Sequence, residues 1–221
     1  MVKGGLTLAS KIVIEREKMP EYIKYRAPEL LKACMAVIAQ SAVGCETETR
    51  TQLKMAGVIE ALMSVIEDYF KGMLPVQSAE YSLLTLINLC EQSHEIQEEL
   101  STNDKLHKVI IFTIMSEHSD CFELVSLVIS LLRKLMARSK AERDRIAEMY
   151  LLTFAAIVEA HTHKVEQIKS EKIIPPNFDP VKAFLLKETI ATMGELAAEP
   201  EHREALISGA DVVFDVLQAA R

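Results

Sequence analysis

The sequence predicts an all-α protein built from repeated helical units. Glycine and proline are scarce, at 7 residues each among 221, while 49% of the residues are hydrophobic. That composition favours long apolar helices over a sheet protein rich in turns. Apolar residues recur at steps of three and four, as on the buried face of a helix, and one short pattern returns along the chain. No segment requires a strand.

The N-terminal part predicts helices of ordinary length after an irregular start. Residues 1–27 are expected to form an irregular helical segment that precedes the first complete unit. Pro28 then opens a helix over 28–42, because proline is tolerated in the first turn, where its missing N–H has no helical partner. A further apolar helix is expected over 58–70.

The later helices follow the same periodicity. A helix is expected over 79–92 and a long helix over 143–172, and Pro180 is placed to open another over 180–198. The segment "IIPPNFDP", at about residues 173–180, interrupts the pattern as a proline-rich insertion. Loops of this kind either close over their own domain or reach out to a partner.

A short motif marks each unit: an arginine or glutamine stands three residues before an aliphatic anchor. The four pairs are Arg50/Leu53, Gln97/Leu100, Arg143/Ile146 and Arg203/Leu206. Successive anchors are 47, 46 and 60 residues apart, about the size of a two- or three-helix solenoid repeat, with the last spacing enlarged by the insertion. We therefore expect a single repeat domain over 28–221 with about four units, the last of them incomplete.

Two segments resemble the armadillo repeat. In "LINLCEQSHEIQEEL" a third helix ends in the form L-x-N-L-x and leads into a short first helix, and "TQLKMAGVIEALMSVI" contains the form A-G-x-I-x-x-L. The related HEAT repeat fits the weaker copies nearly as well. The resemblance implies a right-handed α-solenoid that binds proteins through a concave surface lined by the third helix of each unit.

The resemblance also identifies candidate binding residues. The third helices align on an aliphatic residue, which is Ile38, Leu89, Leu135 or Leu196 in successive units. The residue before it, expected to face a partner, is Val37, Asn88, Lys134 or Glu195. The candidate partner contacts are Tyr81, Asn88, Arg133, Lys134, Glu188 and Glu195. Such a groove would pass from basic to acidic along its length, which would set the orientation of a partner.

Asn88 is open to two interpretations. Armadillo proteins that bind extended peptides use a ladder of asparagines together with tryptophans, and this chain has only Asn88 in that row and no tryptophan. Binding of nuclear localisation signals is therefore disfavoured. Asn88 is expected either to contact a partner or, as a helix-terminal residue, to satisfy a local carbonyl.

Apolar residues in two other places are further candidate contacts. Ile174 and Phe178 lie in the proline-rich insertion, and Phe214 and Leu217 lie in the last predicted helix. A solenoid normally ends in a polar cap, which this last helix lacks. Either another molecule covers that end, through self-association or assembly, or the sequence is a fragment of a longer protein.

Several classes of protein are excluded by composition. The net charge is −7 with the cations dispersed among acids, which disfavours nucleic-acid binding. The longest apolar runs are well short of the roughly 20 residues that a membrane span needs. The four cysteines show no C-x-x-C spacing and the N-terminus has no apolar signal region. We expect a cytoplasmic protein, with the nucleus, cilium or cytoskeleton also compatible.

The sequence predicts no enzyme, no cofactor and no metal site. His161 and His163 are two residues apart and so lie on different faces of a helix, while Glu159 with His163 and His118 with Cys121 lack a third ligand. There is no nucleophile elbow and no glycine-rich phosphate loop.

The sequence thus predicts a noncatalytic protein–protein interaction module or scaffold, acting as a subunit or adaptor of a larger assembly. Two alternatives stay open. One is a structural subunit of a cytoskeletal or ciliary complex, and the other is a chaperone cofactor of the armadillo-like kind that promotes nucleotide exchange.

Overall fold

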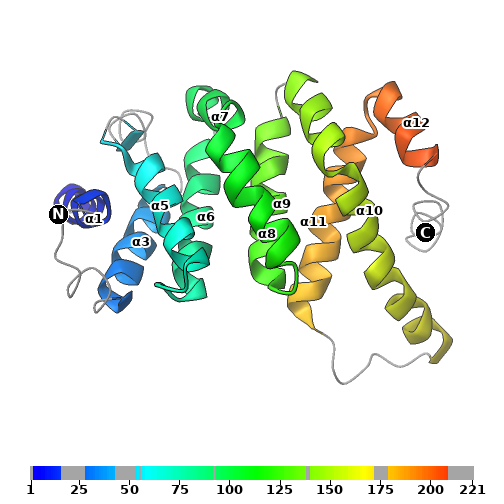
Figure 1. Ribbon diagram of the computed structural model, residues 1–221, viewed down its shortest axis with the longest axis horizontal. Coiled ribbons are helices and arrows are strands. Elements are labelled where there is room, and N and C mark those ends of the chain that lie inside the picture. Colours follow the sequence, from blue (N-terminus) through cyan, green and yellow to red (C-terminus); the bar gives the residue numbers. More distant parts are fainter. Residues whose placement is uncertain are drawn as a thin grey trace. The chain divides into compact units, whose positions relative to one another are not determined.

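The computed structural model describes residues 2–15, 28–42, 53–54, 56–91, 93–137, 140–171 and 179–208. Every regular element in these ranges is a helix (Figure 1), so the all-α prediction is confirmed for the described part of the chain. No helix among the described residues is long and apolar enough to cross a membrane.

The chain divides into two compact units, Met1–Glu117 and His118–Arg221. Within the first unit, the N-terminal helix α1 (Val2–Glu15) packs against α3 (Pro28–Ala42). The expected boundary at residue 28 stays a prediction.

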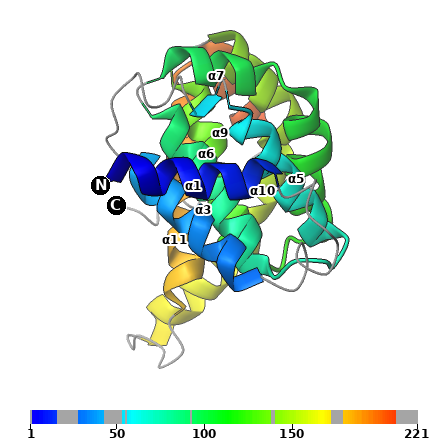
Figure 2. The same cartoon turned by 90° about the vertical axis from the view of Figure 1, so that its left-hand side faces the viewer.

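The first unit is centred on α6. Its remaining helices after α3 are α5 (Val58–Phe70), α6 (Val76–Cys90), α7 (His94–Ser101), the π-helix η2 (Lys105–Ile111) and α8 (Phe112–Glu117). Helix α6 packs on both α3 and α5, while α1 crosses α3 (Figure 2). Met35, Leu62 and Leu86 are among the fully buried side chains of this core. The observed bounds of α3 and α5 are those predicted from the sequence.

Local sequence explains where α5 begins and ends. Gly57 precedes the helix with φ of 78°, and Gly72 follows it with φ of 69°. Both angles lie in the left-handed region, which glycine adopts without the steric cost of a Cβ atom. The backbone N–H of Gly72 donates to the Tyr69 carbonyl at 2.8 Å, so the turn also satisfies a carbonyl at the helix end.

The second unit contains α9 (Phe122–Met136), α10 (Lys140–Glu171), α11 (Pro180–Leu196) and α12 (Pro200–Ser208). Helix α11 packs on both α9 and α10, and α12 contacts α10. Pro180 does open α11, as predicted, and Asp179 caps it by accepting a hydrogen bond from the Val181 N–H at 3.0 Å. The long helix predicted over 143–172 is α10.

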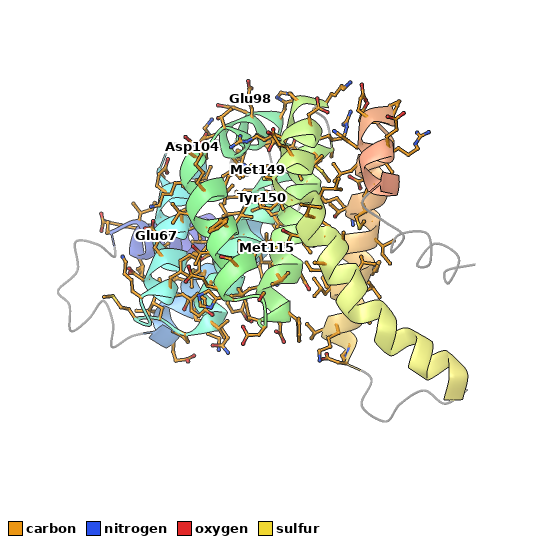
Figure 3. All side chains as sticks on the ribbon, turned by 45° about the vertical axis from the view of Figure 1, so that its right-hand side comes forward. Glu67, Glu98, Asp104, Met115, Met149 and Tyr150 are labelled. Carbon is orange, nitrogen blue, oxygen red and sulfur yellow. The ribbon has the colours of Figure 1, made fainter. Side chains whose placement is uncertain are left out.

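Helix α10 has a buried face and an exposed face within a single turn. Figure 3 shows Met149 and Tyr150 as neighbours on this helix; Met149 is exposed, whereas Tyr150 is buried. The Tyr150 and Phe154 rings lie with their centroids 6.3 Å apart. Burial raises the pKa of Tyr150 to about 12.

Candidate interaction surface

The four helices predicted as third helices of their units are α3, α6, α9 and α11, and they share one pattern of burial. Their aligned aliphatic residues, Ile38, Leu89, Leu135 and Leu196, are all buried. The residues just before them, Val37, Asn88, Lys134 and Glu195, are all accessible to solvent, fully or in part. The alignment made from sequence therefore separates core from surface correctly on all four helices.

In the first unit, polar side chains of α6 contact α3. The Asn88 amide donates from Nδ2 to the Ala39 carbonyl at 3.0 Å. The Ser82 hydroxyl donates to the Ser78 carbonyl at 2.8 Å and lies 3.3 Å from the Met35 sulfur. Asn88 thus satisfies a backbone carbonyl, although on a neighbouring helix rather than locally. The hydrogen bond from its amide group links α6 to α3. Tyr81, another candidate on α6, is half-buried.

In the second unit, an ion-pair cluster joins α9 to α11. Arg133 donates from Nη1 to Glu188 Oε2 at 2.8 Å and lies with Nε 3.2 Å from Glu195 Oε1. The Ser130 hydroxyl also donates to Glu188 Oε2, at 3.2 Å. Glu188 is buried, so these contacts offset the cost of removing its charge from water. Within this unit, Arg133 therefore pairs directly with both acids.

Glu195 is the more accessible acid of this cluster, with 42% of its side chain exposed. Burial of the rest raises the pKa of its carboxyl group above the usual value, and the charges of Arg133 and Lys134 oppose that rise. Its negative charge is therefore less favourable in the folded protein than in water.

The repeated motif has a common structural role that the sequence did not predict. Its polar residue donates to a carbonyl at the end of the preceding third helix. The bonds are Gln97 Nε2 to Cys90 O at 3.0 Å, Arg143 Nη1 to Met136 O at 3.1 Å, and Arg203 Nε to Ala197 O at 3.1 Å. The last carbonyls of a helix have no intrahelical partner, so each of these side chains caps a helix. Arg50 lies outside the described residues.

The anchors complete the motif. Leu53, Leu100, Ile146 and Leu206 are all buried. An anchor three positions after the polar residue lies about one turn further along the same helix. On one face of the helix, the polar side chain therefore caps the preceding helix and the anchor side chain packs in the core. The clue in the sequence was the spacing: the polar residue follows the capped carbonyl by seven, seven and six residues.

The remaining candidates from the sequence are not placed by the structure. Ile174, Phe178, Phe214 and Leu217 lie outside the described residues, as do the side chains of His161 and His163. Among the side chains that are described, no three or more histidines, cysteines or acids are grouped to hold a metal ion.

Comparison of the chain with protein-family models, with curated proteins and with solved structures found no match. The observations that bear on its class are the internal ones: the repeated cap, the buried anchors and the shared burial pattern of the third helices.

Proposed function

We propose that this chain is an armadillo- or HEAT-like α-solenoid that acts as a noncatalytic protein–protein interaction module. One observation carries the proposal. The same cap and buried anchor occur on α7 in the first unit and on α10 and α12 in the second. Repeated helical units bury their apolar faces against their neighbours and present a continuous surface to a partner, so recurrence on both sides of the division supports one repeat array.

The third-helix surface of the first unit is the binding face we favour. Leu30, Ala33 and Val37 are exposed on α3. Their spacing of three and four residues puts them on one side of the helix. Tyr81 and Leu84 of α6 are half-buried. Contiguous exposed apolar side chains are typical of interaction sites, so the partner we propose is a protein that presents apolar side chains, as one member of a larger assembly.

The test compares two apolar residues of similar exposure in the same unit. Val37 is 44% exposed on α3, and Met73 is 46% exposed in the turn after α5. Proteins captured from native cell extract by the wild-type chain, by Val37→Asp and by Met73→Asp would be identified by mass spectrometry. We expect Met73→Asp to retain a specific partner that Val37→Asp loses.

Both variants place the same charge at an exposed position, so melting temperature and helical content should stay close to wild type. The surface assignment would be wrong if Val37→Asp, still folded, captured every protein that the wild type does. Capture of no specific protein by the wild type would count against the interaction function itself.

A further inference from the structure

His202 contacts two acceptors from two different helices. It lies in the first turn of α12 and is 9% exposed. Its Nε2 atom is 3.0 Å from Asp144 Oδ1 of α10, and its Nδ1 atom is 3.3 Å from the Leu196 carbonyl oxygen, at the last residue of α11. The imidazole therefore bridges α12, α10 and α11 through its two nitrogens.

Whether His202 can donate a hydrogen bond to both acceptors at once depends on the protonation state of its ring. A neutral imidazole has one N–H and one lone pair, whereas the imidazolium has two N–H groups. A neutral ring that donates to the carbonyl points its Nε2 lone pair at a carboxylate oxygen. A neutral ring that donates to Asp144 loses the bond to Leu196. Only the charged ring donates to both acceptors at once.

The elements that meet at His202 carry other charged groups close in sequence to it or to its contact residues, and several of these groups have partners of their own. From α10 they are Lys140, Arg143 and Asp144; from the end of α11 and the turn that follows, Glu195 and Glu199; from α12 itself, Glu201 and Arg203. Arg143 pairs with Glu199 at 2.7 Å and Lys140 with Glu201 at 3.5 Å. Glu195 lies against Arg133, and Arg203 donates to backbone carbonyls. Asp144 is the acid that contacts His202, and it is half exposed to solvent.

We propose that His202 is a proton-dependent clamp that holds α12 against α10 and the end of α11. Protonation adds a second donated hydrogen bond and a charge-assisted contact to Asp144, so α12 is held more tightly as the pH falls. Deprotonation removes one of the two bonds and loosens the helix. Because Leu206 of α12 is buried, loosening would expose an anchor side chain. This inference does not depend on the proposed function.

Hydrogen exchange of the α12 backbone amides tests the clamp in the full chain. Exchange would be followed at about pH 5.5 and about pH 8, on either side of the usual titration range of imidazole, and corrected for intrinsic rates. In the wild type we expect protection about tenfold greater at the lower pH, since one charge-assisted hydrogen bond is worth about that factor. His202→Gln should remove most of this difference.

A second histidine supplies the matched control. His94 of α7 is exposed, and its Nδ1 atom is 3.9 Å from Glu98 Oε2. His94→Gln should leave the pH dependence of α12 intact. Asp144→Asn keeps an acceptor oxygen but removes its charge, so it should reduce the difference without abolishing it.

Two results would overturn the clamp. One is equal protection of α12 at the two pH values in the wild type, and the other is a pH difference that survives in His202→Gln. If His202→Gln failed to fold, the ring nitrogen resonances of His202 in the wild type would decide, because the clamp requires both nitrogens to carry protons when α12 is most protected.

Discussion

The third-helix pairs of the two units are held together by different chemistry. In the first unit α3 and α6 meet through buried apolar side chains, with one amide-to-carbonyl bond from Asn88 to Ala39. In the second unit α9 and α11 meet across a buried carboxylate, Glu188, which accepts hydrogen bonds from Arg133 and Ser130. Similar burial of the aligned aliphatic residues is thus compatible with a neutral or an ionic connection between the helices.

The difference affects what each surface can offer a partner. In the second unit, Arg133 is engaged with Glu188 and Glu195 within the unit, and the exposed Phe184 ring lies 5.9 Å from the Lys187 ammonium group. In the first unit the connection uses few charges and leaves Leu30 and Val37 exposed. The charged candidates Arg133, Glu188 and Glu195 thus form ion pairs with one another across neighbouring helices.

The largest expected effect concerns the buried aligned residues that the two third-helix pairs share. Leu89→Ala and Leu196→Ala each remove a fully buried side chain, and each should lower the free energy of unfolding by about 2 to 5 kcal/mol. Urea denaturation followed by circular dichroism would measure both losses. A loss much below 1 kcal/mol at either position would show that the two leucines do not have equivalent environments.

The next effect tests the difference between the pairs. Arg133→Met leaves Glu188 with the Ser130 hydroxyl but without its cation, which should cost about 1 to 3 kcal/mol. Asn88→Leu replaces the amide with an apolar side chain of similar shape and removes one neutral hydrogen bond. It should lower the free energy of unfolding by about 0.5 to 1.5 kcal/mol. Urea denaturation of both variants would compare the losses.

The control for this comparison is Arg133→Met combined with Glu188→Met, which removes the stranded carboxylate and should recover part of the lost stability. If Arg133→Met cost no more than Asn88→Leu, the ionic connection would be of no special importance to the second unit.

A smaller effect tests the repeated cap in each unit. Gln97 is buried and Arg203 is exposed. Gln97→Met should therefore cost about 1 kcal/mol, and Arg203→Met less than about 0.5 kcal/mol, since water can replace the lost bond at an exposed site. The neighbouring variants Glu98→Ala and Glu204→Ala serve as controls and should change melting little. A Gln97→Met variant as stable as its control would contradict the capping role.

The smallest effect concerns Glu195 and its dependence on pH. Because burial raises its pKa in the folded state, the native protein binds this proton more readily than the unfolded chain does. Its contribution to stability is therefore present at pH values below its usual titration and is lost as the pH rises through the raised pKa. Glu195→Gln should gain stability relative to wild type at neutral pH, by less than about 0.5 kcal/mol because the group is partly exposed to solvent.

Glu201→Gln supplies the contrast, since a backbone N–H and the Lys140 charge lower the pKa of Glu201. The sign of its pH dependence is reversed: the contribution of Glu201 is present above its usual titration and lost as the pH falls. The free energy of unfolding of both variants would be measured in acid and at neutral pH. A pH-dependent change of the same sign in both variants would contradict the opposite pKa shifts of Glu195 and Glu201.

Much of the fold was predictable from short stretches of sequence. The bounds of α3 and α5 follow from Pro28 and from the turn at Gly57, because caps and breakers act within a few residues of themselves. The candidate surface was predictable only in part. Val37 and Ile38 were assigned correctly to surface and core by the alignment of the third helices that the resemblance implies, but that alignment does not specify which group on a neighbouring helix Asn88 or Arg133 contacts.

The sequence by itself determined the all-α class, the helices α3, α5, α6, α10 and α11, and which side of each third helix is buried, since 3.6-residue periodicity and local capping are properties of neighbours along the chain. Tertiary structure alone decided that Gln97 and the two arginines cap preceding helices, that Asn88 bonds to Ala39, and that Arg133 reaches acids 55 and 62 residues away. Such bonds depend on distances across packed helices, and no local pattern specifies those distances.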